Sequence, residues 1–385
     1  MKLKYNNKKT ILLLAGGTGG HIFPAQAFAE YCIQNGDNIH WIGTNRGLEK
    51  QITQKYNIDF TEIKFNGLRG KSIFKFIKFP FSLLYNLIHI KTLFKRIKPD
   101  ITISFGGYST IPGGIISYLT KTPLILHEQN AKIGRANKFL SYFAKIHSSA
   151  YENVFPEKFN NTSQTIGNPL RNLFYNNQIK FNQKSNINIL ILGGSLGARF
   201  LNQTIPNIIK NINNNINITH QTGESGYKNT CKLYQDLYQD SQINLSNIKI
   251  IKFIDKMPDI YKQTDIIICR SGALTVSEVS AFGIPAIYIP YPIAMDNHQW
   301  HNAQPLVKQN AAYCLEEKDI KQNHKVLINL INEIINNTTK RFEMHKNAIN
   351  FAMTKLNATE KLYQIAIKHL DQSDQFESEL PRPES

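Results

Sequence analysis

The stretch from Asp265 to Glu278, DIIICRSGALTVSE, combines a short apolar run with residues suited to holding an anion. The run is typical of a strand buried on both faces, and Ser271 is expected to cap a following helix from Ala273 to Phe282. A helix start offers free N–H groups and a positive dipole end to a phosphate. Glu278 lies about 6 Å along the axis from Leu274, so a diphosphate at the helix start would leave a ribose near its carboxylate. The alternative is an ordinary strand, turn and helix with a solvated glutamate.

A second stretch whose residues could take part in catalysis is Gly16-Gly-Thr-Gly-Gly-His21, which follows the apolar run Ile11–Ala15. An imidazole titrates near neutral pH, so His21 suits a general base. The alternative is a structural role in which His21 ties the glycine loop to a neighbouring strand. His127 and Glu128, at the end of another apolar run, are the fallback bases.

These loops belong to a pattern of strand, glycine turn and helix that occurs twice. We expect a first-half helix from Pro24 to Asn35, and the second half begins with Gly193-Gly-Ser-Leu-Gly-Ala198. The pattern predicts two doubly wound domains facing each other, with ligands at the carboxyl ends of their strands. The expected strands are Ile11–Ala15, Ile39–Ile42, Ile101–Phe105, Pro123–His127, Ile187–Leu192 and Ile266–Cys269.

Neither glycine loop fits a common nucleotide fingerprint. In a dinucleotide-binding frame that starts at Gly17, Ile22 occupies the place of the last glycine, and the loop at 193–198 lacks the Lys-Ser/Thr of a P-loop. The loops therefore favour close backbone approach to a bulky polar ligand over hydride transfer or NTP hydrolysis.

Composition sets the outer bounds. The 385 residues favour two domains, and the net charge of +17 favours an anionic partner such as a phosphorylated substrate, a membrane surface or nucleic acid. The four cysteines are scattered without a C-x-x-C pair, which favours a reducing compartment and disfavours a zinc site. No uncharged apolar stretch reaches the roughly 18 residues of a membrane span.

The segment 72–98 interleaves bulky apolar residues with cations. This mixture is typical of a helix at the interface of an anionic bilayer. The alternative is a buried helix with a solvated basic face. The residues expected at a membrane are Phe74, Lys75, Phe76, Lys78, Phe79 and Phe81.

Taken together, seven motifs in one order resemble the peptidoglycan N-acetylglucosaminyltransferases of glycosyltransferase family 28. The resemblance covers nearly the whole chain, from Ile11 to about Leu370. The motifs are Gly16-Gly-Thr-Gly-Gly-His21, Phe65-Asn-Gly-Leu-Arg-Gly70, Gly106-Gly-Tyr108, His127-Glu-Gln-Asn130, Gly167-Asn-Pro-Leu-Arg171, Gly193-Gly-Ser-Leu-Gly-Ala198 and Arg270-Ser-Gly-Ala-Leu-Thr-Val-Ser-Glu278.

The resemblance implies an α/β GT-B fold, in which a deep cleft separates two Rossmann-like domains. It implies an N-terminal acceptor- and membrane-binding domain over 1–168, joined by a C-terminal helix at about 357–371, and a UDP-GlcNAc-binding domain over 169–356. The polar residues 372–385 are expected to form a disordered tail.

The resemblance also implies the site. Gly16, Gly17, Gly106, Gly107 and Tyr108 are expected to bind the acceptor. The expected donor contacts are Thr18, Gly19, Gly20, Asn130, Arg171, Ser195, Ile254, Ala273, Leu274, Thr275, Val276, Ser277, Glu278 and Gln299. The family has two adjacent glutamines after an Asp, whereas this chain has Asp296-Asn-His-Gln299. Which of His298 and Gln299 touches the sugar therefore stays open.

The implied reaction is inverting: the 4-hydroxyl of the muramoyl sugar of undecaprenyl-pyrophosphoryl-MurNAc-pentapeptide (lipid I) attacks C1 of the N-acetylglucosamine of UDP-GlcNAc, which makes lipid II. His21 is the expected catalytic base. No cofactor or metal is required, and stimulation by Mg²⁺ stays open. The implied partners are UDP-GlcNAc, lipid I, the anionic inner-membrane surface at its cytoplasmic face and proteins of cell-wall synthesis, with no nucleic acid.

Two rival interpretations remain. One is another GT-B UDP-sugar enzyme, epimerase-like or with a soluble acceptor, which the segment 72–98 disfavours. The other is an inactive scaffold at the membrane surface, which only His298 favours.

Overall fold

The chain divides into two compact units, each built on a parallel β-sheet. The computed structural model describes residues 8–44, 48–65, 73–171, 174, 181, 186–194, 198–212, 216–238 and 247–378, without the side chains of 73–79, 295 and 372–378. The N-terminal unit comprises 1–171 and 355–385, and the C-terminal unit comprises 172–354. The sequence analysis predicted the domain boundaries after residues 168 and 356.

The N-terminal unit has a seven-stranded sheet in the order β3-β2-β1-β4-β5-β6-β7. Every pairing in it is parallel. The expected first-half strands are confirmed to within a residue at each end. The strands are β1 Thr10–Leu14, β2 Asn38–Gly43, β3 Asp59–Glu62, β4 Ile101–Ser104, β5 Leu124–Glu128, β6 Ile146–Ser149 and β7 Ser163–Thr165.

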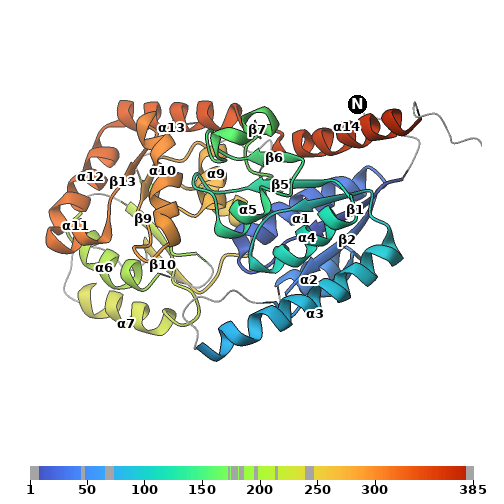
Figure 1. Cartoon of the computed structure of the whole chain (residues 1–385). Coiled ribbons are helices and arrows are strands. Elements are labelled where there is room, and N and C mark those ends of the chain that lie inside the picture. The colour runs from blue at the N-terminus through green and yellow to red at the C-terminus, as the bar shows by residue number, and fades with distance from the viewer. Residues whose placement is uncertain are drawn as a thin grey trace, which may run out of the picture. The chain divides into compact units, whose positions relative to one another are not determined.

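Both faces of this sheet are covered by helices, because successive residues of a strand point to opposite faces. Ile11 and Leu13 of β1 pack in one core with α1 and α14, while Leu12 and Leu14 pack in another core with α3 and α4. Figure 1 shows the helices along the sheet. The helices are α1 Gly19–Gln34, α2 Leu48–Lys55, α3 Ile73–Ile97, α4 Ile111–Leu119, α5 Arg135–Leu140 and α14 Ala358–Ser378.

The expected start of α1 at Pro24 is wrong, because the helix begins at Gly19 and Pro24 lies inside it. Glycine is a poor helix former, but tertiary packing outweighs this propensity. A Cβ at Gly19 would come within 2.9 Å of the Phe23 ring, so that ring packs against the bare backbone. The last three residues of the glycine motif therefore form the first turn of the helix.

Helix α14 belongs to the N-terminal unit although it follows the other unit in sequence. Leu362, Ala366 and Leu370 recur at helical spacing and are buried in the core that contains α1. The helix continues to Ser378, so the expected disordered tail from residue 372 is wrong as far as that residue. Residues 379–385 of the expected tail lie outside the described residues.

The C-terminal unit has a six-stranded parallel sheet in the order β10-β9-β8-β11-β12-β13. Its strands are β8 Ile187–Leu192, β9 Ile216–Gln221, β10 Ile248–Ile251, β11 Ile266–Cys269, β12 Ala286–Tyr288 and β13 Ala312–Cys314. Its helices are α6 Arg199–Ile209, α7 Tyr227–Tyr238, α8 Met257–Tyr261, α9 Ala273–Ala281, α10 His298–Lys308, α11 Glu317–Gln322, α12 His324–Asn336 and α13 Thr338–Met353.

The order of strands places the two central strands, β8 and β11, side by side with their glycine turns at the same edge. The same holds for β1 and β4 in the N-terminal unit. The two units thus have Rossmann-like sheets, as the sequence predicted, and their loops at the carboxyl ends of the strands carry the candidate site residues.

Candidate active site

His21 is held in one orientation and one tautomer. Its Nδ1 lies 2.9 Å from the carbonyl oxygen of Phe105 and 3.0 Å from Oε1 of Gln129. Both neighbours are acceptors, so Nδ1 carries the proton and donates. Nε2 of the neutral ring then has its lone pair available. The two interpretations of His21 are therefore compatible, because one nitrogen anchors the loop while the other is left for proton transfer.

The glycines expected to bind the acceptor let two loops touch. Gly106 and Gly107 have φ of +91° and +95°, a region that favours glycine. A Cβ at Gly107 would lie 2.3 Å from the carbonyl oxygen of Gly16, and one at Gly106 would lie 3.4 Å from the His21 ring. Tyr108 follows directly and is half-buried. The loop after β4 therefore forms the backing for the loop after β1.

Glu49 is a residue of this region that the sequence analysis missed. It is buried, and its Oε1 accepts hydrogen bonds from the N–H of Gly17 at 3.3 Å and the hydroxyl of Thr44 at 2.7 Å. Glu49 thus holds the glycine loop from behind. A lone glutamate in a short amphipathic helix carries no signal of this role in the sequence.

Both fallback bases are wrong. His127 is fully buried, contacts Ser148 and Asn168, and has its pKa lowered to about 4 by burial, so it is neutral and shielded from solvent. The Glu128 carboxylate is also buried and accepts four hydrogen bonds, two of them from Asn130. Glu128 therefore orders the loop that carries Asn130, a predicted donor contact.

Arg171, another predicted donor contact, lies at the end of the first segment of the N-terminal unit. Its guanidinium lies over the ring of Phe23, 4.9 Å from the ring centre. A cation held on an aromatic face keeps its N–H groups in plane for other acceptors.

The helix start at α9 has the expected form but not the expected cap. Gly272, with extended backbone, is the N-cap, and no side chain accepts a hydrogen bond there. The expected capping role of Ser271 is wrong, because its hydroxyl is buried without a hydrogen-bond partner. Its carbonyl oxygen instead accepts from Asn302 at 3.1 Å. The start of α9 thus presents backbone N–H groups with no side-chain cap, the arrangement that suits an anion.

The six predicted donor contacts at 273–278 on α9 differ in how exposed their side chains are. Ala273, Leu274 and Val276 are buried in the core, so only their backbone is suited to a ligand. Thr275, Ser277 and Glu278 are half-buried on the exposed side of α9.

Tyr261 supports Glu278 and was also missed from the sequence. It is fully buried, and its hydroxyl donates to Oε2 of Glu278 at 3.4 Å. Burial, reinforced by the Glu278 carboxylate, raises the pKa of the Tyr261 hydroxyl well above its ordinary value. The hydroxyl therefore stays protonated and orients the carboxylate.

The remaining predicted donor contacts have different outcomes. Ser195 lies outside the described residues, although the preceding Gly194 is described, with φ of +84°. The side chain of Ile254 is buried, and its N–H donates to Oε1 of Gln221 at 3.1 Å. Thr18, Gly19 and Gly20 form the start of α1.

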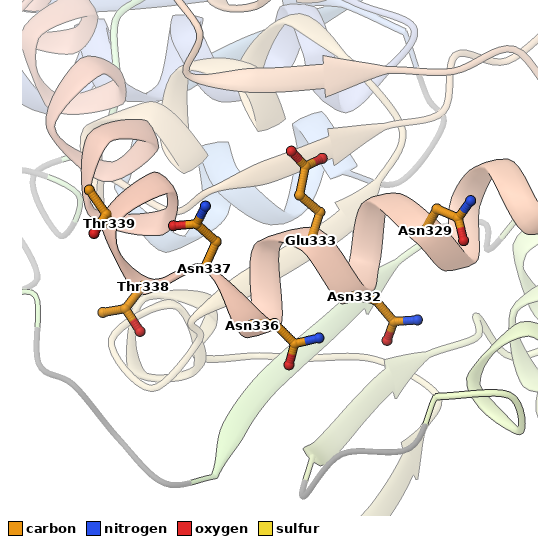
Figure 2. A pocket seen from close by; sticks show the side chains of 7 residues that line it. All are labelled: Asn329, Asn332, Glu333, Asn336, Asn337, Thr338 and Thr339. Carbon is orange, nitrogen blue, oxygen red and sulfur yellow. The ribbon is translucent and has the colours of Figure 1, made fainter.

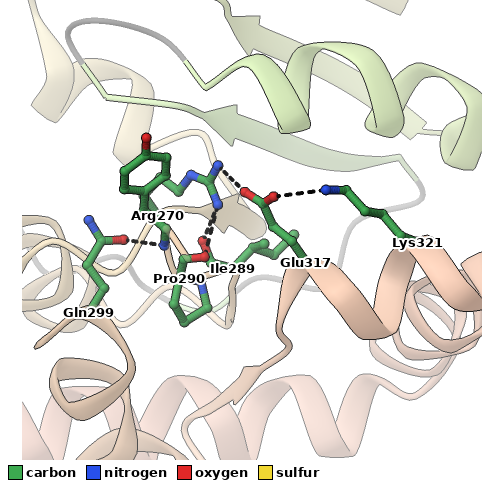
Figure 3. Close-up of polar contacts among 7 residues, drawn as sticks. Arg270, Ile289, Pro290, Gln299, Glu317 and Lys321 are labelled. Carbon is green, nitrogen blue, oxygen red and sulfur yellow. Dashed lines mark hydrogen bonds and ion pairs between the residues drawn. The ribbon is translucent and has the colours of Figure 1, made fainter. Parts of the chain in front are cut away.

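A buried ion pair fixes the loop between β12 and α10 (Figure 3). Arg270 donates to Glu317 at 2.6 Å, and the two side chains are only 11% and 8% exposed. The same guanidinium donates to the carbonyl oxygens of Ile289 and Pro290 at 2.9 and 3.1 Å. The arginine of the predicted motif is thus a structural anchor for the next loop.

That loop leads into α10, and at this junction the chain departs from the family's two adjacent glutamines. Asp296 and Asn297 both have positive φ, and α10 begins at His298. Oε1 of Gln299 accepts from the N–H of Tyr291 at 2.9 Å, which leaves the amide Nε2 as its donor group (Figure 3).

A separate surface pocket of about 670 Å³ lies between α12 and the start of α13 (Figure 2). Amides and hydroxyls line it, and none of its residues belongs to the predicted site. The lining residues are Asn329, Asn332, Glu333, Asn336, Asn337, Thr338 and Thr339.

Two Rossmann-like units, each with glycine turns at the carboxyl ends of its central strands, are the architecture of GT-B glycosyltransferases. Residues 11–147 match the glycosyltransferase family 28 N-terminal domain, and residues 188–362 match the glycosyltransferase family 28 C-terminal domain. The chain belongs to this family.

Relatives of the whole chain support the assignment. A Francisella tularensis protein named UDP-N-acetylglucosamine--N-acetylmuramyl-(pentapeptide) pyrophosphoryl-undecaprenol N-acetylglucosamine transferase is 40% identical over 88% of this chain and 92% of its own. The crystal structure of Acinetobacter baumannii MurG aligns with a TM-score of 0.77 at 33% identity, over 94% of this chain and 99% of that one. A Neisseria meningitidis UDP-GlcNAc 2-epimerase shares the fold alone, with a TM-score of 0.64 at 15% identity over 93% of this chain and all of that one.

We expect Glu317→Ala to destabilise the C-terminal unit by about 3 kcal/mol or more, because it leaves the buried Arg270 charge without its partner. Glu316→Ala is the matched control, since Glu316 pairs with Lys318 at the surface, where such pairs contribute about 0–1 kcal/mol. Denaturant unfolding of both variants measures the difference. Equal losses would show that the Arg270–Glu317 pair is no more than a surface contact.

Proposed function

We propose that the protein transfers N-acetylglucosamine from UDP-GlcNAc to the 4-hydroxyl of undecaprenyl-pyrophosphoryl-MurNAc-pentapeptide in peptidoglycan synthesis, an inverting reaction that makes lipid II. The observation that carries this function is the match of both units to one family, together with 40% identity over 88% of the chain to a relative named for this reaction.

His21 is the base in this proposal. Its Nδ1 donates to Phe105 and Gln129, so Nε2 accepts the proton of the attacking hydroxyl. The glycines around it admit the diphosphate and sugar of the acceptor to the backbone. The acceptor is thus bound by loops of the N-terminal unit.

The donor is bound by the C-terminal unit in this proposal. The positive dipole end at the start of α9 stabilises the charge that develops on the leaving UDP, with Ser195 as a further donor. Glu278 accepts the ribose hydroxyls, and Gln299 offers its amide to the sugar. Because the helix start carries this electrostatic task, the reaction is proposed to need no cofactor; adding Mg²⁺ or EDTA to the assay tests this.

The decisive experiment mixes the purified protein with UDP-GlcNAc and a short-chain lipid I analogue and follows UDP release and the disaccharide product. Transfer to the muramoyl sugar supports the proposal. Formation of an epimerised UDP-sugar without acceptor would favour the epimerase-like alternative, and the absence of any turnover would favour the inactive scaffold.

We predict that His21→Asn lowers kcat by about 10² to 10⁴. The Asn amide retains a donor near the position of Nδ1 but has no basic nitrogen, so this variant separates catalysis from anchoring. UDP affinity, measured by calorimetry, should stay unchanged. His89→Asn, an exposed histidine on α3, is the control. A kcat close to that of the unmodified protein would exclude His21 as the base.

Glu278→Ala should weaken UDP binding at least tenfold, because hydrogen bonds to a charged acceptor contribute roughly 1.5–3 kcal/mol each. The unmodified protein should also prefer UDP over 2′-deoxy-UDP, and the variant should lose this preference. Calorimetry with both nucleotides measures it, with Glu316→Ala as control. Retained discrimination would place the ribose elsewhere.

We also propose that α3 binds the anionic surface of the inner membrane at its cytoplasmic face, where the lipid acceptor resides. In the described part of the chain, no helix is long and apolar enough to cross a membrane. The solvent side of α3 is apolar at Phe81, Leu84, Tyr85 and Ile88, which are 72%, 57%, 69% and 61% exposed. Lys91, Lys95 and Arg96 are also exposed.

This surface supports the interface interpretation over a helix with a solely basic solvated face. The side chains of Phe74, Lys75, Phe76, Lys78 and Phe79 lie outside the described residues, so only Phe81 of the predicted set contributes to the argument. Each cation contributes about 1 kcal/mol near an anionic leaflet. Proteins of the cell-wall machinery remain proposed partners without a surface assigned to them, and nucleic acid has no part in the proposal.

Phe81→Ser with Ile88→Ser should abolish co-sedimentation with anionic vesicles at low salt and leave turnover of a short-chain acceptor intact, because both side chains are exposed and no packing is lost. The control pair is Ile33→Ser with Met353→Ser, which are exposed apolar residues on other helices. If both pairs bind vesicles equally, α3 is not the membrane surface.

A further inference from the structure

Gln221 occupies the point where two donor loops of the C-terminal unit come together. It is the last residue of β9, between Leu192 at the end of β8 and Ile251 at the end of β10. The loop after β8 contains Gly194, and the loop after β10 contains Ile254. Parallel strands end at the same edge, so a side chain at the middle strand's end reaches both loops.

The amide of Gln221 uses both of its polar groups in this way. Nε2 donates to the carbonyl oxygen of Gly194 at 3.1 Å, and Oε1 accepts from the N–H of Ile254 at 3.1 Å. The residue is 1% exposed. An apolar side chain of similar length neither donates nor accepts, so such a replacement leaves two buried backbone groups unsatisfied.

We call the two hydrogen bonds of the Gln221 amide, to Gly194 and to Ile254, the clamp. The residues on either side of Gln221 in the chain support it. His220 is buried between Tyr234 and Asn202, and burial lowers its pKa to about 3, so it stays neutral. Thr222 and Gly223 donate from their N–H groups to Ile251 and Lys252, in the strand and loop next to them. The chain on both sides of Gln221 is therefore fixed by hydrogen bonds of its own.

We infer that Gln221 is a positioning residue for the donor nucleotide, which sets the spacing between the backbone at Gly194 and the backbone at Ile254. This inference rests on the proposed function, because it takes both loops to contact UDP. Gln221 itself does not touch the reacting atoms. It acts on donor affinity and leaves the acceptor and the chemical step alone.

The test compares Gln221→Met and Gln221→Glu with Gln263→Met, an exposed glutamine of the same unit. Gln221→Met should raise the UDP Kd and the donor KM about tenfold, with kcat and acceptor KM little changed. Gln221→Glu adds a pH readout. A protonated carboxyl both donates and accepts as the amide does, whereas an ionised one only accepts and faces the Gly194 carbonyl.

Burial raises the pKa of a carboxyl, so the introduced glutamate should be protonated at acidic pH and ionised at alkaline pH. The ratio of the donor KM of Gln221→Glu to that of the unmodified protein should therefore be close to one at about pH 5.5 and should rise severalfold at about pH 8.5. A ratio that does not change with pH overturns the inference, as does a Gln221→Met variant that matches Gln263→Met. If Gln221→Met fails to fold, the single variant Gln221→Glu still decides at the two pH values.

The failure of each proposal is distinguishable. An unmodified protein that transfers the sugar while Gln221→Glu shows no pH-dependent donor KM overturns only the clamp. An unmodified protein that does not bind UDP overturns the proposed function and the clamp together.

Discussion

The contact between the loops after β1 and β4 is the constraint on which the N-terminal site depends. These loops meet backbone to backbone, since a Cβ at Gly107 would lie 2.3 Å from the carbonyl oxygen of Gly16. Only this approach lets His21 reach the carbonyl oxygen of Phe105 and lock its tautomer. A larger residue would separate the loops and release the imidazole. The glycines therefore position the histidine.

In the C-terminal unit, polar side chains rather than glycine contacts hold the loops of the candidate site in place. Gln221 joins two loops, Arg270 and Glu317 hold a third, and Tyr261 orients Glu278. Each is buried or nearly so and has hydrogen-bond partners, which avoids the cost of an unpaired polar group in a low-dielectric interior. The predicted donor contacts are thus supported by a layer of buried polar side chains.

Several predictions from the sequence were wrong for one reason. They inferred a residue's role from its neighbours in the sequence, whereas tertiary contacts decide that role. Pro24 suggested a helix start, but the ring of Phe23 packs on Gly19 and the helix begins earlier. Ser271 suggested a cap, but its hydroxyl is buried. His127 and Glu128 suggested bases, but both lie inside the unit and are committed to internal hydrogen bonds. A side chain can act as a base only if it is accessible, and the local sequence pattern does not show how exposed a side chain is.

The sequence by itself determined the two Rossmann-like sheets, since uninterrupted apolar runs such as Ile266–Cys269 are typical of strands buried on both faces. Its ordered motifs also determined the family and hence the reaction. The tertiary structure alone revealed the supporting residues Glu49, Gln221 and Tyr261. Each contacts a partner at least 17 residues away in the chain, and no periodicity or local motif encodes a hydrogen bond between segments that only folding brings together.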